Sequence, residues 1–259
     1  MIKFFRKIRQ KMLSENPPDQ AGRAGKFSKY LLYAIGEIVL VVIGILIALQ
    51  INNWNEDRKI QKNEITILEQ LNDDLSKNLE EVLEIKSILD QASRNSNSFL
   101  LYLNSQNNHS DSISAWLDQI DRNPIFNNAN TAYKNLENNP NKIISNDALR
   151  LRITLMYEKE FRNIDVRENG YKTQFYPEFK KQQRANFTMT IEVSEDGKDL
   201  IFDYIRPKNI EKLKENDAFK NAVVDLYNFS KLRINFLSLT ENILRVLIQD
   251  IEQEIGSLE

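Results

Sequence analysis

Residues 68–92, LEQLNDDLSKNLEEVLEIKSILDQA, carry the pattern that decides the fold. Apolar side chains recur over more than three heptads at the a and d positions that packed helices use. Asn78 takes one d position, and Asp74 and Glu81 flank the seam. The pattern fits either a parallel coiled coil between chains or one helix of an antiparallel bundle, and we favour the bundle because other long helices follow. The apolar seam residues are Leu68, Leu71, Leu75, Val82, Ile85, Leu89 and Ala92.

This helix can continue in both directions without interruption. No proline occurs from Asp19 to Asn123, and no glycine occurs from Ile45 to Glu168. Proline and glycine are the least favourable residues inside a helix. We therefore expect one long helix near residues 56–104, which runs outward from the segment described next.

Toward the N-terminus, residues 30–51, YLLYAIGEIVLVVIGILIALQI, have the length and composition of a transmembrane helix. These 22 residues span roughly 33 Å at 1.5 Å per residue, enough to cross the hydrocarbon core. Fourteen of them are Leu, Ile or Val, and these favour insertion by roughly 4–8 kcal/mol. The one carboxylate, Glu37, opposes insertion by about 3 kcal/mol if it is central. Insertion is therefore favoured.

The charge distribution sets the orientation of this helix. Residues 1–29 contain eight basic and two acidic residues, whereas the remaining residues carry a net charge of −8. Basic flanks stay in the cytoplasm, so we expect a basic cytoplasmic segment at 1–29, the transmembrane helix at 30–51 and an extracytoplasmic helical domain at 52–259. A cleaved signal peptide is the rival interpretation, but the apolar run is too long for one and lacks a small-x-small site at its end. The aromatic residues that suit the two membrane interfaces are Tyr30, Tyr33 and Trp54.

Glu37 needs an explanation, because an anchor alone has no use for an acidic residue. On a helix, Glu37 shares one stripe with Val41, Gly44 and Ala48. Gly44 and Ala48 form a small-xxx-small pair that lets another helix approach closely. We therefore expect helix–helix association through this stripe, either with another copy or with another membrane protein. The alternative is that the Glu37 carboxyl reaches the headgroups and the small residues are incidental.

Three stretches of the chain resemble a known family. Residues 26–56, KFSKYLLYAIGEIVLVVIGILIALQINNWNE, resemble the N-terminal signature of a family of uncharacterised bacterial single-pass membrane proteins with a domain of unknown function. The opening MIKFFRKIRQKMLSE resembles the start of the same family, and residues 132–157, AYKNLENNPNKIISNDALRLRITLMY, resemble its middle block. The resemblance implies an inner-membrane location and assigns no catalytic residues.

Beyond residue 104 the apolar pattern changes several times. Residues 105–140 are rich in Asn and Ser, which indicates loops around short helices near 113–120 and 132–137. A third long helix is expected at 146–176, with a possible kink near Gly170 and Pro177. Apolar and polar residues alternate on both sides of Asp196-Gly197, which predicts a β-hairpin at about 187–204. The last long helix is expected at 217–255, with an apolar stripe of Phe219, Val223, Leu226, Leu232, Phe236, Leu239, Ile243, Leu247, Ile251 and Ile255.

The composition excludes several kinds of chemistry. The chain has no cysteine and one histidine, His109, so disulfides, thiolate metal sites and two-histidine metal sites within one chain are excluded. No glycine-rich phosphate loop, nucleophile elbow or EF-hand loop occurs. The net charge of −2 argues against a nucleic-acid-binding protein. We assign no catalytic, cofactor-binding or metal-ligating residue, and we expect no cofactor.

The sequence therefore predicts a mainly α protein, in which one N-terminal transmembrane helix precedes an extracytoplasmic long-helix bundle or coiled coil with a small β-hairpin. Its expected location is the bacterial inner (plasma) membrane, and its expected partners are the lipid bilayer and a second membrane helix. We expect an interaction protein, such as a scaffold, a sensor or a subunit of an envelope assembly. An extracytoplasmic enzyme with an unrecognised carboxylate site is the alternative, and a pocket with converging carboxyl groups of raised pKa would favour it.

Overall fold

The computed structural model describes residues 23–108, 111–138 and 143–259. The chain forms two compact units, Met1–Lys59 and Ile60–Glu259. Helix α2, Arg23–Leu103, contributes residues to both units. Most of the basic segment at 1–29, and also His109, lie outside the described residues.

In the first unit, one helix near the N-terminus is long and apolar enough to cross a membrane. An 18-residue window of this helix has a mean hydropathy of 2.6, and no residue in the window is buried inside the structure. The large apolar side chains from Ile35 to Ile51 are all exposed. A helix satisfies its own backbone N–H and C=O groups, which is what a lipid environment requires of a spanning segment.

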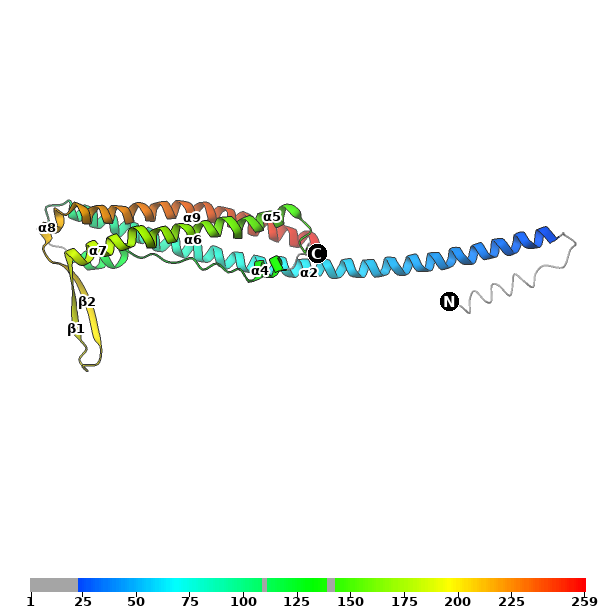
Figure 1. The fold of residues 1–259 in the computed structure, drawn as a ribbon, viewed down its shortest axis with the longest axis horizontal. Coiled ribbons are helices and arrows are strands. Elements are labelled where there is room, and N and C mark those ends of the chain that lie inside the picture. Colours follow the sequence, from blue (N-terminus) through cyan, green and yellow to red (C-terminus); the bar gives the residue numbers. More distant parts are fainter. Residues whose placement is uncertain (1–22, 109–110, 139–142) are drawn as a thin grey trace. The chain divides into compact units, whose positions relative to one another are not determined.

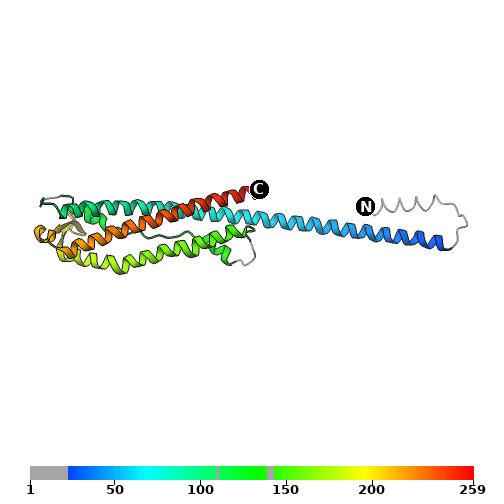
Figure 2. The same cartoon turned by 90° about the horizontal axis from the view of Figure 1, so that it is seen from above.

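Three long helical elements run alongside one another in the second unit (Figures 1 and 2). The first is the part of α2 from Ile60 onward. The third is α9, Asp217–Leu258. The second element is continuous and comprises α5, Asp147–Leu155, η1, Met156–Phe161, α6, Arg162–Gly170, η2, Tyr171–Phe175, and α7, Tyr176–Asn186. The three long helices expected from the sequence are therefore confirmed.

The heptad seam of α2 is buried within the chain. All seven apolar seam residues are at most 2% exposed. They belong mainly to one core cluster, which also contains Ile153 of α5, Phe161 of η1 and Leu244 of α9. The seam therefore packs against the other two long elements and leaves no apolar surface there for a second chain. This agrees with an intrachain bundle.

The second long element continues past the point where the sequence suggested that it would end or kink. Its π-helical turns, η1 and η2, each widen the helix locally, as an inserted residue does. Gly170 has helical dihedral angles, with φ −57° and ψ −43°. Pro177 lies in the first turn of α7, directly after η2, so the residue that lacks an N–H falls where the helix changes from π to α hydrogen bonding. The helix therefore runs on to Asn186 rather than ending near residue 176.

The short elements occur where the sequence places them. Helix α3 spans Ile113–Ile120, and helix α4 spans Thr131–Asn138. Strands β1, Phe187–Val193, and β2, Leu200–Pro207, form an antiparallel hairpin with an irregularity between Thr190 and Ile191, so the expected hairpin is confirmed. A short helix, α8, Ile210–Lys214, precedes α9.

The base of the hairpin packs against the helices. Phe187, the first residue of β1, is buried in a core cluster with Phe179 of α7 and Phe219 of α9. Ile191 and Val193 are exposed, and Figure 1 shows the two strands extending away from the helices. At the turn, Gly197 has a φ of +70°, a conformation that glycine adopts without steric cost.

The buried face of α9 differs from the expected apolar stripe in the middle of the helix. Leu232, Leu239 and Ile243 are exposed, so their assignment to the core is wrong. Each residue turns a helix by about 100°, so a neighbouring row of residues can face the core in place of the expected one. This is the case in the middle of α9. The buried residues in this part of α9 are Ser230, Arg233, Leu237, Thr240 and Leu244.

Candidate functional site

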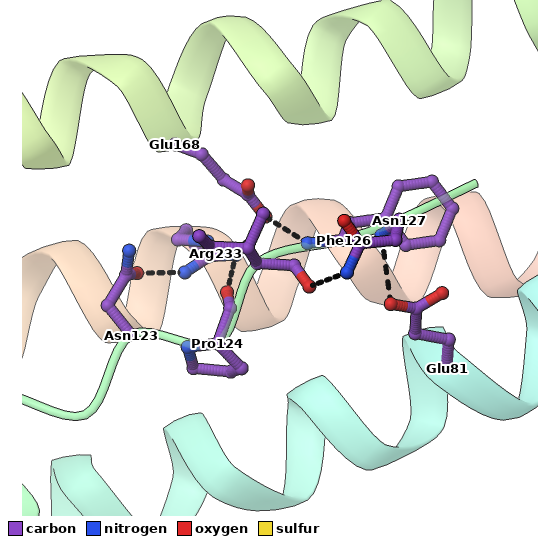
Figure 3. A network of polar contacts seen from close by, with 8 residues as sticks. Glu81, Asn123, Pro124, Phe126, Asn127, Glu168 and Arg233 are labelled. Carbon is purple, nitrogen blue, oxygen red and sulfur yellow. Dashed lines mark hydrogen bonds and ion pairs between the residues drawn. The ribbon is translucent and has the colours of Figure 1, made fainter.

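A buried ion pair joins α6 to α9 (Figure 3). Arg233 donates a hydrogen bond to the Glu168 carboxylate, with 2.8 Å between Arg233 Nη2 and Glu168 Oε1. The two side chains are 3% and 4% exposed. Both charges have therefore lost their hydration, and such a pair is stable only when its remaining donors and acceptors also find partners.

The loop between α3 and α4 supplies those partners. Arg233 donates to the backbone carbonyl of Pro124, with 3.2 Å from Nη2 to the oxygen, and also to the side-chain oxygen of Asn123. The backbone N–H of Phe126 donates to Glu168 Oε1 at 3.0 Å. The ion pair thus holds the loop against two helices at once, as Figure 3 shows.

Burial shifts the pKa values of both charged groups toward their neutral forms. The pKa of Glu168 is raised by desolvation, and the hydrogen bond from the Phe126 N–H and the charge of Arg233 oppose that rise. The pKa of Arg233 is lowered by desolvation, and the charge of Glu168 opposes that fall. A raised carboxyl pKa also occurs in acid–base catalysts. Here, however, the carboxyl is closed off from solvent and already hydrogen-bonded, so the arrangement serves to position the loop.

Helix α2 holds the same stretch of chain from the other side. The Asn78 side chain makes two hydrogen bonds to Ala129, donating to its carbonyl at 2.9 Å and accepting from its N–H at 2.6 Å. The backbone N–H of Asn127 donates to Glu81 at 2.8 Å, and that of Ala132 donates to Asp74 at 2.9 Å. Side chains in and beside the heptad seam therefore pair with the backbone N–H and C=O groups of residues 127–132. Those groups would otherwise lack hydrogen-bond partners inside the structure.

A further carboxylate on α2 extends this row toward the next helix. Glu64 accepts hydrogen bonds from the backbone N–H and the hydroxyl of Ser145, at 2.7 and 2.8 Å. The neighbouring Asn146 caps α5 by accepting from the N–H of Leu149 at 3.1 Å. Acidic and amide side chains of α2 thus set the path of residues 125–145 wherever the structure describes them.

The stripe of Glu37, Val41, Gly44 and Ala48 lies on an open surface of α2. Glu37, Val41 and Ala48 are exposed. A Cβ atom added to Gly44 would meet nothing within 4 Å. The helix therefore presents the stripe without covering it, and a partner helix could reach the small residues directly.

The expected membrane-interface residues are described only in part. Trp54 is exposed, and the guanidinium carbon of Arg58 lies 5.9 Å from the centroid of its indole ring. Tyr30 and Tyr33 lie on the helix, but their side chains are outside the described part of the structure. The ring of Trp54 thus combines an apolar body with a nearby positive charge, as residues at a headgroup boundary do.

A shallow groove of about 500 Å³ lies between α7 and β1. Two of its basic residues have partners nearby, since Lys180 pairs with Asp121 and Lys181 pairs with Glu178. No carboxylate is among the lining residues of this groove, so it lacks the converging acids that an enzyme of the expected kind would need. The lining residues are Tyr176, Pro177, Lys180, Lys181, Gln183, Arg184, Phe187 and Thr188.

Within 23–108, 111–138 and 143–259, no three His, Asp or Glu side chains gather in a group that could hold a metal ion. The acidic residues Glu64, Asp74 and Glu81 lie apart along α2. Each accepts a hydrogen bond from a different backbone N–H.

Sequence reasoning missed the buried ion pair. Glu168 and Arg233 lie 65 positions apart. Glu168 stands in a polar stretch, and Arg233 stands between Leu232 and Ile234 in the apolar part of α9, so neither local sequence announces a buried charge. One signal was available, because Arg233 falls on the row of Ser230, Leu237 and Leu244 at heptad spacing. Either that row or the row of Leu232 and Leu239 could face the core. Hydrophobicity alone favours the row of Leu232 and Leu239, which is exposed in the structure.

Comparison with known proteins gives one family. A family model described as "Family of unknown function (DUF6090)" matches residues 37–211. The match covers more than half of the chain, so the chain belongs to this family. The resemblance to an uncharacterised family is thereby confirmed. Searches of curated proteins and of solved structures find no match.

Proposed function

We propose that this member of the DUF6090 family is a single-pass protein of the bacterial inner membrane, which acts as an interaction protein. Residues 1–29 lie in the cytoplasm, residues 30–51 cross the membrane, and residues 52–259 form an extracytoplasmic helical domain. The domain serves as a scaffold, a sensor or a subunit of an envelope assembly.

One observation carries this proposal. The most apolar window of α2 has a mean hydropathy of 2.6 and is not buried by any of the residues that the structure describes, whereas the helices of 60–259 bury their own apolar faces. Exposing so much apolar surface to water is unfavourable, so the segment needs an apolar environment outside its own fold. The basic excess before Tyr30 supports the cytoplasmic placement of the N-terminus.

The open stripe on the membrane helix supports an interaction role. Glu37 weakens insertion, yet it lies on the same face as Gly44 and Ala48. A partner helix that packs there gains close backbone contact and can hydrogen-bond the carboxyl, an interaction worth about 0.6–2 kcal/mol in membranes. The stripe therefore recognises a second membrane helix, from another copy or from another protein.

The described ionisable groups favour an interaction protein over the enzyme alternative. Glu168 has the raised pKa that an acid–base catalyst requires, but Arg233 and the Phe126 N–H occupy it and solvent does not reach it. A substrate cannot approach this carboxyl without opening the bundle.

Topology is tested with a reporter that is active only in the cytoplasm, fused after Glu259. The fusion should be inactive, while the same reporter fused before Met1 should be active. Activity of the C-terminal fusion would overturn the proposed orientation.

The recognition role is tested by chemical crosslinking in native membranes. Glu37→Leu and Gly44→Ile should both remain in the membrane fraction after alkaline extraction and lose the wild-type crosslinked partner. Gly36→Ile is the matched control, because Gly36 is equally open but lies about 100° from Glu37 around the helix. If both stripe variants keep the wild-type crosslinks, the helix is an anchor only.

A further inference from the structure

The side of α9 that faces away from the core is apolar along much of its length. Leu232 and Leu239 are each 63% exposed, and Ile243 and Val246 are exposed as well. These residues lie opposite the buried row of Leu237, Leu244 and Ile251, since two residues along a helix turn it by about 200°. Four large aliphatic side chains on one exposed helical stripe are unusual for a surface that meets only water.

Three of these four residues follow a strict seven-residue repeat, whereas a face that only follows the helix turn repeats every 3.6 residues. Leu232, Leu239 and Val246 are seven residues apart, and all three are exposed. Asn235, Asn242 and Gln249 follow at the same interval and alternate with them, also exposed. The alternating three- and four-residue spacings are those of the a and d positions of a two-helix seam, with apolar residues at a and uncharged polar residues at d. The buried row of α9 then occupies the f positions, on the opposite side.

The uncharged amides of the seam are free to pair. Among the described residues, the side chains of Asn235, Asn242 and Gln249 make no hydrogen bond within the chain. From Asn228 to Gln249 the a and d positions carry no charged residue. An Asn at a seam position pairs well with another Asn and poorly with an aliphatic residue, and it thereby fixes the register of two helices.

We propose that this face of α9 binds the same face of a second copy of the chain, in parallel. In a parallel pair each a residue meets its own copy and each d residue meets its own copy, so Leu meets Leu and Asn meets Asn. In an antiparallel pair every a residue would face a d residue, which would place Leu against Asn in each layer. The sequence of the seam therefore selects the parallel pair.

The flanking charges are complementary in the same arrangement. Arg245 holds a g position and Asp250 the following e position, and these two positions meet across a parallel seam. Within one chain Arg245 already pairs with Glu241 at 2.9 Å, and Asp250 pairs with Arg152 of α5. Contact between copies joins the two ion pairs into one network at each edge of the seam.

The parallel orientation rests on the proposed function, because two chains that are anchored by the same end in one membrane present α9 in the same direction. The seam is short and half of its layers are polar, so it pairs weakly in dilute solution. Confinement to a shared membrane raises the effective concentration of the second copy. The association is therefore a property of the full, membrane-embedded chain.

The absence of native cysteine makes disulfide mapping specific. Leu232→Cys, Leu239→Cys and Val246→Cys are introduced singly into the full chain in native membranes and oxidised mildly. Each should give a disulfide-linked dimer. The matched control is Leu151→Cys on α5, which has a similar exposure of 58% but lies off the seam, and it should remain monomeric. Chains with Leu232→Cys and Gln249→Cys expressed together should give no mixed dimer, whereas an antiparallel pair would give one.

A second variant tests the packing itself. Leu239→Lys should abolish the dimers formed by Leu232→Cys and Val246→Cys, whereas Leu151→Lys should leave them unchanged. Equal crosslinking at Leu151 and on the seam, or no crosslinking at any seam position in chains that remain membrane-embedded, would overturn the inference. A chain that alkaline extraction removes from the membrane would instead contradict the proposed anchor, so the two failures are distinguishable.

Discussion

Arg233 is buried while the adjacent Leu232 is exposed, which reverses the usual preference of the two side chains. The reversal is possible because Glu168, Asn123 and the Pro124 carbonyl all meet the guanidinium. These partners come from a distant helix and a loop, so no local pattern in α9 announces them. Hydrophobicity therefore fails to predict burial where polar groups from distant parts of the chain surround a charged side chain, as they surround Arg233.

The ion pair leads to a prediction about stability. Replacing Arg233 with Met leaves the Glu168 carboxyl buried without its charged partner, so Arg233→Met should lower the free energy of unfolding by about 3–5 kcal/mol. The double variant Arg233→Met/Glu168→Met should recover most of that loss, because it leaves no unpaired charge. Urea unfolding of the full chain in detergent, followed by circular dichroism, measures both values. A double variant as unstable as the single one would show that the loop contacts, rather than the pairing of charges, dominate.

Glu241 provides a prediction about pH. Its pKa is lowered below the ordinary 4.5 by a hydrogen bond from Lys86 of α2 and then by one from Arg245, while desolvation opposes them. A lowered pKa in the folded state means that the stabilisation is complete above pH 4.5 and is lost as the pH falls through the lowered value.

Glu241→Gln should therefore destabilise the chain by about 1 kcal/mol at pH 7, and the difference from wild type should shrink to nothing as the pH falls below 4.5. Thermal unfolding across this range measures the difference. Glu252→Gln, an exposed carboxylate on the same helix, is the control and should match wild type throughout. A difference that stays constant with pH would rule out the Lys86–Glu241 charge interaction as its cause.

At the scale of the elements, the sequence predicted the helices and the hairpin because their apolar periods are long and distinct. The seam of α2 keeps its heptad spacing through the single polar position Asn78, and apolar and polar residues alternate after Phe187. The π-helical turns η1 and η2 could not be predicted, because an inserted residue shifts the helical face without changing its composition. The path of residues 121–130 was equally hidden, since it depends on single side chains of α2, α6 and α9.

Asn78 links helix α2 to the segment of residues 121–130, and this link leads to a further prediction. Leu in its place would complete the heptad seam, so Asn78→Leu should keep the helix intact. The variant removes both hydrogen bonds to Ala129, and the amide of Ala129 should then exchange with deuterium faster, by a factor of about 10 if the bond contributed 1.4 kcal/mol.

Hydrogen exchange measured by mass spectrometry over residues 125–132 tests this change. Exchange in α9 serves as the internal reference and should not alter, because α9 makes no hydrogen bond to Asn78 in the part of the chain that the structure describes. Unchanged protection at Ala129 would mean that the segment is held by the Glu168–Arg233 pair without help from α2.

At the scale of the whole molecule, the chain has two parts that differ in how they bury apolar surface. The apolar part of α2 leaves its apolar side chains exposed, and residues 60–259 bury theirs in two core clusters. The apolar part of α2 has no partner within the structure, whereas two core clusters join all three long elements of Ile60–Glu259. The sequence predicted this division from composition. It placed the start of the helical domain at residue 52, and the second compact unit begins at Ile60. Helix α2 passes both positions without a break, so its helical pattern marks neither boundary.

The last prediction follows from that division. A fragment of residues 60–259 should be soluble without detergent and should unfold in urea in one cooperative transition, because it contains the whole of both core clusters. A fragment of residues 60–216 should not fold, since it lacks Leu226, Leu237, Leu244 and the other α9 residues that both clusters need. Circular dichroism and urea titration compare the two fragments at equal concentration. If the longer fragment aggregates or loses its helical signal gradually, the apolar segment contributes to the fold as well as to membrane attachment, and the cores described here are incomplete without it.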